Sequence, residues 1–241
     1  MVNNYSLDQF IPGHNTVISH AHSDHIKGMK RRGVAITNEI TRDLINNRYN
    51  TNLSIKNDQS IELIPSGHIL GSSQIYIKDI DLLYSGDYQM QKSIVCDGIK
   101  IKEASILLID STYPYSNIVF DDRIEVMNAI ISYINERISN GIVLFGTYSL
   151  GKAQELVKIV NEAGFIPVVD DKIRKMNDVY VKYGINLEYA SYYKDPAELS
   201  DIVRDNFVAI TTMNHLYDMA SKLSIAYNKK VSTAVATGFA K

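Results

Sequence analysis

Short apolar segments separated by turn-forming residues dominate the first half of the chain. Five of these segments are rich in β-branched residues and are bounded by Gly, Asn, Asp or Ser, a pattern typical of strands. They cover residues 16–18, 60–64, 74–77, 81–84 and 106–109. A helix is predicted over residues 38–49, because polar capping residues precede apolar positions that repeat at helical spacing. The pattern therefore predicts a β-rich region over the first 120 residues.

From residue 121 the pattern changes to helices that alternate with strands. Asp121 can cap a helix with an apolar face, formed by Ile124, Met127, Ile131, Ile134 and Ile138. Further helices are predicted over residues 151–163, 173–183 and 216–223, and strands over 142–145, 166–169, 207–211 and 231–236. Strands that alternate with helices indicate a small parallel sheet with helices on both of its faces.

Composition narrows the class of protein only a little. The chain has 241 residues, of which 45% are hydrophobic, enough for one large domain or two modest ones. The net charge of -2 shows no global basic excess, although a local basic groove can sit on a neutral protein. Cys96 is the only cysteine, so no intrachain disulfide can form. Without a recognisable signal peptide or an apolar run long enough to span a bilayer, we expect a cytoplasmic protein.

Histidine and aspartate gather at three places that follow predicted strands. The run His20-Ala21-His22-Ser23-Asp24-His25 comes first, His68 lies among small residues in PSGHILGSS, and Asp87 ends the segment LLYSGD. A lone histidine is more often an ordinary core or surface residue, but three histidines and an aspartate within six residues are rarely kept together by packing alone. Imidazole nitrogen and carboxylate oxygen are donors that zinc takes well.

In this order the motifs resemble the metallo-β-lactamase superfamily, and the fuller pattern resembles its nucleic-acid-processing β-CASP branch. The matching stretches are ISHAHSDHIKG, PSGHILGSSQI, YSGDYQ, LLIDSTYP, YSLGKAQEL and VATGFA. The nearest resemblance is to archaeal and bacterial exonuclease-like proteins related to DNA ligase-associated or mRNA 3′-end-processing factors. The resemblance implies an α/β fold: a metallo-β-lactamase αββα-type sandwich over residues 1–120 and 226–241, with an inserted β-CASP cap over 121–225.

The resemblance also implies two zinc ions, or manganese in their place, and a role for each matching residue. His20, His22 and His68 would hold one metal, Asp24 and His25 the other, and Asp87 would bridge both. Asp8 and Asp110 would support the ligands, Asp110 by orienting a histidine. Asp24, Asp87 and Asp110 are the expected catalytic residues. Two such metals would activate a water as hydroxide and neutralise charge on a phosphodiester.

Two segments are candidates for contact with RNA or DNA. Ser149, Gly151 and Lys152 lie where a strand passes into a helix, and a helix N-terminus can bind phosphate. Spacing alone favours an ordinary turn there, and the resemblance shifts the interpretation to a phosphate contact. The basic patch formed by Lys27, Lys30, Arg31 and Arg32 is either a solvated surface or a groove for the substrate, with even weight on each.

The family pattern continues beyond VATGFA with further histidine motifs, which these 241 residues do not contain. We therefore expect the second metal site to be weaker than the first and the sandwich to have an open edge, which a homo-oligomer could complete. The leading hypothesis is a metal-dependent nuclease acting on RNA or DNA, with exonucleolytic cleavage. The alternatives are a catalytically weak nucleic-acid-binding or complex-forming subunit and a small-molecule metallo-hydrolase.

Overall fold

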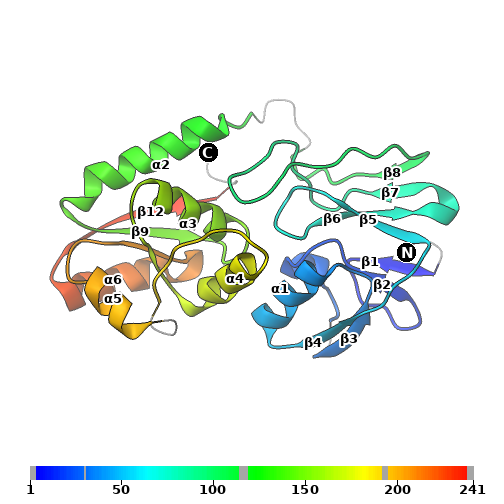
Figure 1. Ribbon diagram of the computed structural model, residues 1–241, viewed down its shortest axis with the longest axis horizontal. Helices are drawn as coiled ribbons and strands as arrows, with labels where there is room; N and C mark the ends of the chain where they lie inside the picture. The colour runs from blue at the N-terminus through cyan, green and yellow to red at the C-terminus, as the bar shows by residue number, and fades with distance from the viewer. Residues whose placement is uncertain (1–3, 30, 114–118, 192–194, 238–241) are drawn as a thin grey trace. The chain divides into compact units, whose positions relative to one another are not determined.

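The structure is a computed structural model that describes residues 4–29, 31–113, 119–191 and 195–237. Lys30 and residues 238–240, which belong to predicted motifs, lie outside these ranges. The chain divides into two compact units, Met1–Ile118 and Val119–Lys241 (Figure 1). Both strands and helices are well represented, so the chain is a mixed α/β protein, as the sequence predicts.

Within its described residues, the first unit contains three sheets and one long helix. Parallel pairs are formed by β1 (Tyr5–Leu7) with β2 (Asn15–Val17) and by β3 (Arg32–Ala35) with β4 (Asn52–Ile55). A further sheet has the order β5-β6-β7-β8. Its strands are Ile61–Pro65, Ser73–Ile77, Leu82–Tyr84 and Ile106–Leu108. The pairs β5–β6 and β6–β7 are antiparallel, whereas β7–β8 is parallel.

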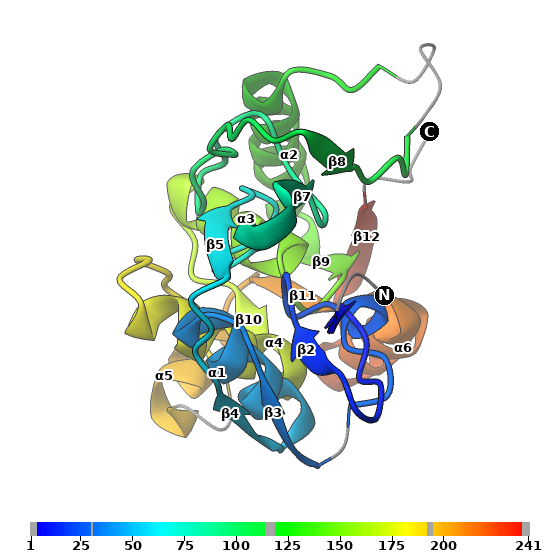
Figure 2. The ribbon, with the colours of Figure 1, turned by 90° about the vertical axis from the view of Figure 1, so that its right-hand side faces the viewer.

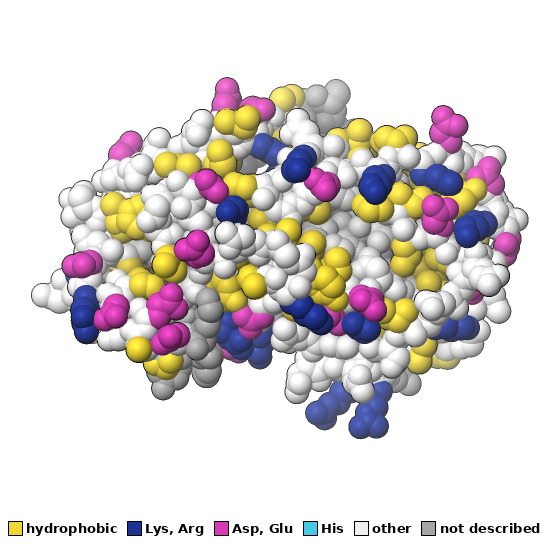
Figure 3. All heavy atoms as spheres, viewed as in Figure 1, with side chains coloured by type: hydrophobic (Ala, Val, Ile, Leu, Met, Phe, Trp, Pro, Cys, Tyr) yellow, Lys and Arg dark blue, Asp and Glu magenta, His cyan; other side chains and the backbone are white. Residues whose placement is uncertain are grey.

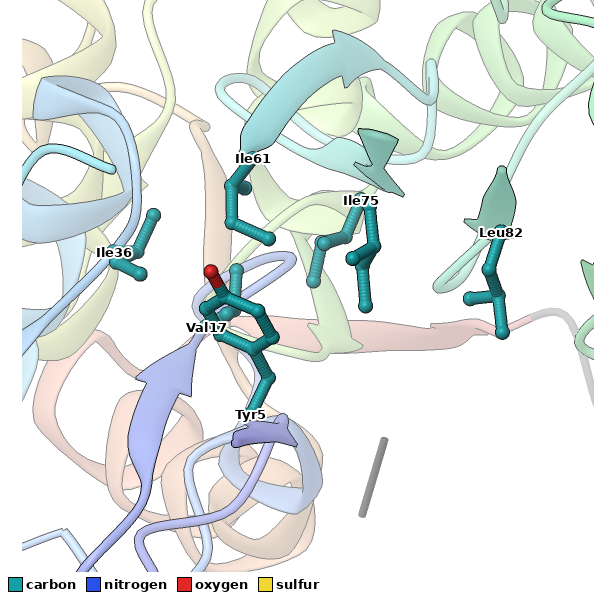
Figure 4. Packing of buried hydrophobic residues seen from close by; sticks show 7 residues of the cluster. Tyr5, Val17, Ile36, Ile61, Ile75 and Leu82 are labelled. Atoms are coloured by element: carbon teal, nitrogen blue, oxygen red, sulfur yellow. The ribbon is translucent and has the colours of Figure 1, made fainter. Parts of the chain in front are cut away.

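One apolar cluster joins these sheets (Figure 4). Tyr5 and Val17 come from β1 and β2, and Ile36 follows β3. Strands β5, β6 and β7 contribute four further buried residues to the same cluster, Ile61, Ile75, Ile77 and Leu82. Alternation along each strand directs every second side chain into this cluster. The carboxyl ends of β2 and β7, which lead into the histidine and aspartate motifs, are therefore fixed to a common core.

The long helix of this unit is α1 (Glu39–Tyr49). The unit also contains two short 3-10 turns, η1 (Ser23–His25) and η2 (Lys78–Ile80). Asn38 caps α1 by accepting a hydrogen bond from the Thr41 backbone N–H at 2.8 Å. Buried Leu44 and Ile45 form its apolar face. The helix ends at Tyr49, and the next residue, Asn50, caps it with a left-handed backbone conformation. The predicted helix over residues 38–49 is confirmed.

The second unit is built on one fully parallel sheet of order β10-β11-β9-β12 (Figures 1 and 2). Its strands are β9 (Gly141–Thr147), β10 (Val168–Val169), β11 (Val208–Thr212) and β12 (Lys230–Ala236). The helices are α2 (Arg123–Ile138), α3 (Lys152–Glu162), α4 (Asp171–Lys182), α5 (Pro196–Ile202) and α6 (Leu216–Tyr227), with the turn η3 (Met213–His215) before α6. This is the predicted parallel sheet with alternating helices.

Four details differ from the predictions. Asp122, one residue later than predicted, caps α2 and accepts hydrogen bonds from the Ile124 and Glu125 backbone N–H groups. The segment 226–241, expected with the first domain, contains β12, which pairs with β9 along seven residues of the second unit. The short strands β1, β3 and β4 were missed because each holds too few apolar residues to show a period. Helix α5 was also missed, although its Asp195-Pro196 start is a recognisable signal.

The charged side chains of the described residues indicate no particular binding face. On the face shown in Figure 3, Lys and Arg side chains lie among Asp and Glu side chains, in keeping with the balanced charge. Within the described ranges, no helix combines the length and the apolar character that a membrane-spanning segment needs.

Candidate metal centre

The run from His20 to His25 leaves the carboxyl end of β2 and turns into η1. The Ile18 backbone N–H donates to the Ile36 carbonyl, and the Ser73 N–H donates to the Ser19 carbonyl, at 3.0 and 2.9 Å. These bonds fix the chain on both sides just before the first histidine. His20 is fully buried, whereas His22 and His25 are half-buried. The change from strand to turn lets successive side chains point to one place.

His68 lies in the loop between β5 and β6, which two glycines shape. Gly67 and Gly71 have φ values of +77° and +78°, which L side chains rarely adopt. A Cβ at Gly67 would lie 2.6 Å from the Ile99 backbone nitrogen, and one at Gly71 would lie 2.7 Å from Ile40 Cβ. The loop is thus packed closely on both sides of His68, which explains the small residues noted in the sequence.

Asp87 follows β7 and the tight turn at Gly86. A Cβ at Gly86 would lie 2.9 Å from the Ser19 Cβ, so this glycine lets the two loops approach each other closely. Ser85 holds the turn through its backbone N–H, which donates to the Leu108 carbonyl at 2.9 Å. As a result the Asp87 carboxylate faces the histidines.

Four side chains converge on one point, with all their donor atoms within 4.8 Å of one another: His20, His22, His68 and Asp87. His22 Nδ1 lies 3.0 Å from His20 Nε2 and 3.2 Å from His68 Nε2. Asp87 Oδ2 lies 3.4 Å from His68 Nε2 and 3.8 Å from His20 Nε2. Tetrahedral zinc with bonds of about 2.1 Å needs donors about 3.4 Å apart, so this set fits zinc in both chemistry and spacing.

A second group of donors lies on the other side of the same carboxylate. His25 Nε2 is 3.2 Å from Asp87 Oδ1 and 3.6 Å from Asp24 Oδ2. The two oxygens of Asp87 therefore face different histidines, which is the arrangement a bridging ligand requires. The second group is less enclosed, because the Asp24 side chain is 68% exposed.

Asp8 is linked to both groups of donors, to His25 directly and to His20 through the Ser19 hydroxyl. Its Oδ2 lies 2.7 Å from His25 Nδ1, and it accepts hydrogen bonds from the Ser19 hydroxyl at 2.7 Å and the Tyr84 hydroxyl at 2.9 Å. Its Oδ1 accepts from the Ser19 backbone N–H at 2.7 Å. Asp8 is buried, so its two oxygens are held in place by these donors.

This network fixes which nitrogen of each ring carries a proton. The single Ser19 hydroxyl proton goes to Asp8, so the Ser19 oxygen accepts from His20 Nδ1, 3.0 Å away. His20 then presents a bare Nε2 to the centre. His25 Nδ1 donates to Asp8 in the same way, which leaves Nε2 on the side of Asp87. His20 therefore has Nε2 free for a metal, and His25 would have it free once its Nε2 proton is lost.

Burial and neighbouring charges shift the pKa values of this cluster. Burial, together with the nearby His22 and His25, holds the pKa of His20 well below its usual range, so the ring is neutral. Burial also lowers the pKa of His25, but hydrogen bonds with Asp8 and Asp87 outweigh it and raise this pKa to about 10. Burial raises the pKa of Asp87, and the hydrogen bond with His25 more than reverses that effect. A metal at His25 Nε2 would take the place of the proton there.

The structure places Asp110 just after β8. Its backbone N–H donates to the Ser85 hydroxyl at 2.9 Å, and its Oδ1 accepts a hydrogen bond from the Thr112 hydroxyl at 2.9 Å. In the described part of the chain, the carboxylates that bond to His25 are those of Asp8 and Asp87. The roles of Asp110 in catalysis and in orienting a histidine remain predictions.

The three predicted substrate contacts lie together at the start of α3 in the second unit. Gly151, with φ +88°, caps this helix, and its backbone N–H donates to Gln154 Oε1 at 2.7 Å. Lys152 pairs with Glu155 at 2.9 Å, and Ser149 is half-buried with its carbonyl accepting from Gln154 Nε2 at 3.2 Å. Lys152 would have to exchange this carboxylate for a phosphate.

Sequence reasoning missed Ser19 and Tyr84, although both contact Asp8. Ser19 stands next to His20, and a hydroxyl beside a metal-binding histidine is a signal that could have been used. Tyr84 lies 76 positions from Asp8, and nothing local to it indicates the contact. Gln154 was likewise noted only as part of a motif, whereas it is fully buried and bonds to the Asn177 side chain at 2.8 Å.

Known proteins match this chain over limited lengths. A "Probable DNA ligase" of Opitutus terrae is 29% identical over 192 residues, which cover 74% of this chain and 19% of that protein. An "Uncharacterized protein in lig 3'region" of Acidianus ambivalens is 30% identical over 144 residues, 57% of this chain and 97% of that protein. An "RNase J-like protein" of Methanocaldococcus jannaschii is 33% identical over 102 residues, 40% of this chain and 24% of that protein. No family model matches the chain.

The mixed α/β fold, a group of His and Asp side chains that could hold a metal ion, and these relatives are consistent with one family of proteins. The chain belongs to the β-CASP branch of the metallo-β-lactamase superfamily. It spans only about a fifth of the ligase-named relative and a quarter of the RNase J-like one.

Proposed function

We propose that this protein is a metal-dependent phosphodiesterase that cleaves RNA or DNA, acting as an exonuclease. The observation that carries the proposal is the convergence of His20, His22, His68 and Asp87 at metal-binding spacing. Their arrangement within a β-CASP sequence supports a nucleic acid as substrate, because the family's named members here include an RNase J-like protein. The relatives' names point to both DNA and RNA.

In this proposal each side chain has a defined task. His20, His22 and His68 would hold the first metal, His25 and Asp24 would hold the second, and Asp87 would contribute to both sites. Bound zinc or manganese would supply Lewis-acid activation of water and neutralise charge on the phosphodiester. Asp8 keeps His20 and His25 in the tautomers that bind metal. The catalytic roles of Asp24, Asp87 and Asp110 are part of the proposal.

The remaining tasks concern the polynucleotide. Ser149, Gly151 and Lys152 are proposed to contact a backbone phosphate, since the N-terminus of α3 carries partial positive charge. Lys27, Arg31 and Arg32 are exposed, which suits either a solvated surface or an approach groove. Because phosphate contacts release counterions, substrate affinity should fall steeply with salt.

Of the alternatives, a catalytically weak binding or complex-forming subunit has one observation in its favour. In the described residues, the second metal group comprises only His25, Asp24 and Asp87, and Asp24 is largely exposed. A chain that fills only the first group would bind metal but turn over slowly. A small-molecule metallo-hydrolase is disfavoured, because the parallel α/β unit has no part to play in such a reaction.

The test combines metal content with cleavage of 5′-labelled single-stranded RNA and DNA. His68→Ala should remove the first metal and all cleavage. His14→Ala is the matched control, because His14 lies in the same unit and its ring bonds to the Pro12 carbonyl, away from the metal-binding motifs. Two metals and metal-dependent cutting that only His68→Ala abolishes would support the nuclease. Tight binding without cutting would support the binding subunit, and cleavage of thioesters alone would refute the proposal.

A further inference from the structure

Helix α1 contacts both loops that carry ligands of the first metal group, one at each of its ends. Its first turn bonds to the loop that holds His68, and its last turn bonds to the loop that holds His20 and His22. None of the helix residues involved belongs to the metal-binding motifs. The following inference about them rests on the proposed metal centre.

The first contact is a pair of hydrogen bonds to the Gly71 carbonyl. Asn38 Nδ2 donates to it at 2.6 Å and the Thr41 hydroxyl donates to it at 2.8 Å. Thr41 is fully buried, and Gly71 packs against Ile40 so closely that a Cβ would overlap it. Gly71 is three residues from His68, and the loop closes on itself through the Ser66 N–H and the Ser72 carbonyl. The position of this loop is therefore set by the first turn of α1.

The second contact is made by Arg48. Its Nη1 donates to the Ala21 carbonyl at 3.2 Å, and its guanidinium lies 5.2 Å from the centre of the Tyr49 ring. Ala21 is fully buried and stands between His20 and His22, so this bond holds the backbone that joins two ligands. Burial of the Arg48 stem against Tyr49 restricts the guanidinium to this direction.

The two contacts are seven residues apart on one helix, which is about 10 Å along its axis. A helix is rigid over that length, so α1 fixes the separation of the loops at Gly71 and Ala21, in addition to the direct bond from the Ser73 N–H to the Ser19 carbonyl. His22 Nδ1 and His68 Nε2, one from each loop, are 3.2 Å apart, within the range for two donors on one metal. We propose that α1 acts as a strut that sets this separation, with Thr41 and Arg48 as its positioning residues.

A strut makes a specific prediction about the release of both ends. Once either end is released, the helix no longer fixes the distance between the loops, so releasing the other end should change little. Thr41→Val, combined with Asn38→Asp so that neither side chain donates to the Gly71 carbonyl, releases the first end, and Arg48→Met releases the second. Each release should weaken metal binding by about 10-fold, the lower end of the range for residues that support metal ligands. The variant with both ends released should bind metal only slightly more weakly than the worse of the two. Independent effects would instead multiply to about 100-fold.

The experiment measures cobalt(II) binding by its visible absorption and zinc binding by competition with a chelator. Asn46→Ala is the matched control, because Asn46 fixes the same helix to β4 through the Leu53 backbone and makes no contact with either loop. This control should lower the melting temperature yet leave the cobalt spectrum and affinity unchanged. Arg48→Lys, which keeps a donor, should recover part of the affinity lost in Arg48→Met.

The outcomes separate the strut from the proposed function. Weaker binding when either end is released, an altered cobalt spectrum and a variant with both ends released that is close to the worse of the two would support the strut. Unchanged binding in Thr41→Val with Asn38→Asp and in Arg48→Met, multiplicative losses, or an equal loss in Asn46→Ala would overturn it while leaving the metal centre intact. Absence of cobalt binding to the wild-type chain would overturn the strut and the proposed function together.

Discussion

Replacing Asp8 by asparagine should separate the protonation pattern of the centre from its shape. The amide matches the carboxylate in size, so packing around this buried residue changes little. Asp8 Oδ2 receives the Ser19 hydroxyl, His25 Nδ1 and the Tyr84 hydroxyl, and an NH2 group in its place cannot accept any of them. His25 would lose the acceptor that holds its Nδ1 proton, so the ring would give up that proton first and keep the one on Nε2, the nitrogen that faces Asp87.

The magnitude follows from the bonds that are lost. Two or more hydrogen bonds to a charged group, at about 1.5 kcal/mol each, give a loss of about 3 kcal/mol in the free energy of unfolding. Metal affinity should fall about 10- to 100-fold, since the substitution removes the group that orients two ligands. Tyr84→Phe is the control, because it deletes one of the three donors and leaves both tautomers in place.

The assay is urea unfolding of the metal-free chain together with zinc titration against a chelator. Asp8→Asn should lower both quantities, and Tyr84→Phe should lower mainly the free energy of unfolding. Wild-type zinc affinity in Asp8→Asn would refute the idea that Asp8 sets the histidine tautomers. A loss of affinity in Tyr84→Phe equal to that in Asp8→Asn would show that only rigidity matters.

Three other predictions test separate parts of the structure. Asp122→Ala should cost about 1 kcal/mol of stability in urea unfolding, because Asp122 caps α2, whereas Asp121→Ala should cost little; the reverse order would contradict the assigned cap. Burial raises the pKa of half-buried Glu155, but Lys152 and Arg123 outweigh it and hold this pKa below the ordinary value of 4.5. The stabilising effect of Glu155 is therefore complete above pH 4.5 and is lost as the pH falls through the folded-state pKa. Glu155→Gln should therefore flatten the acid limb of the stability profile, and an unchanged acid limb would show that the ion pairs contribute nothing. The edge strand β8 has three apolar side chains that are 41–54% exposed, Ile106, Leu107 and Leu108. If two copies of the chain pair through this edge, size-exclusion chromatography should show a concentration-dependent dimer that Leu107→Lys dissociates. A wild-type chain that stays monomeric at high concentration would exclude this dimer.

The ligands of the first metal group could be found from sequence because their signal is local. Three histidines and an aspartate within six residues stand out, and His68 and Asp87 follow apolar segments that mark the ends of strands. The parallel sheet of the second unit was predictable for the same reason, since its strands and helices are long enough to show a period. These features depend on neighbours along the chain.

The parts that sequence reasoning missed depend on contacts between distant residues. Tyr84 meets Asp8, and Arg48 meets Ala21, only once the sheets and α1 have packed. The pairing of β12 with β9 joins segments about 90 residues apart, and the strand pattern of β12 suits either unit equally well. Short strands such as β3 are held by their partners more than by their own composition.

We propose above that His20, His22, His68 and Asp87 hold a metal ion. This site can be located in a crystal of the full chain grown with zinc, with diffraction data collected on both sides of the zinc absorption edge. We expect an anomalous peak about 2.0–2.2 Å from each of the four donor atoms, with a second, weaker peak beside His25 and Asp24. If crystals that show zinc elsewhere have no peak at the four donors, these residues do not form a zinc site.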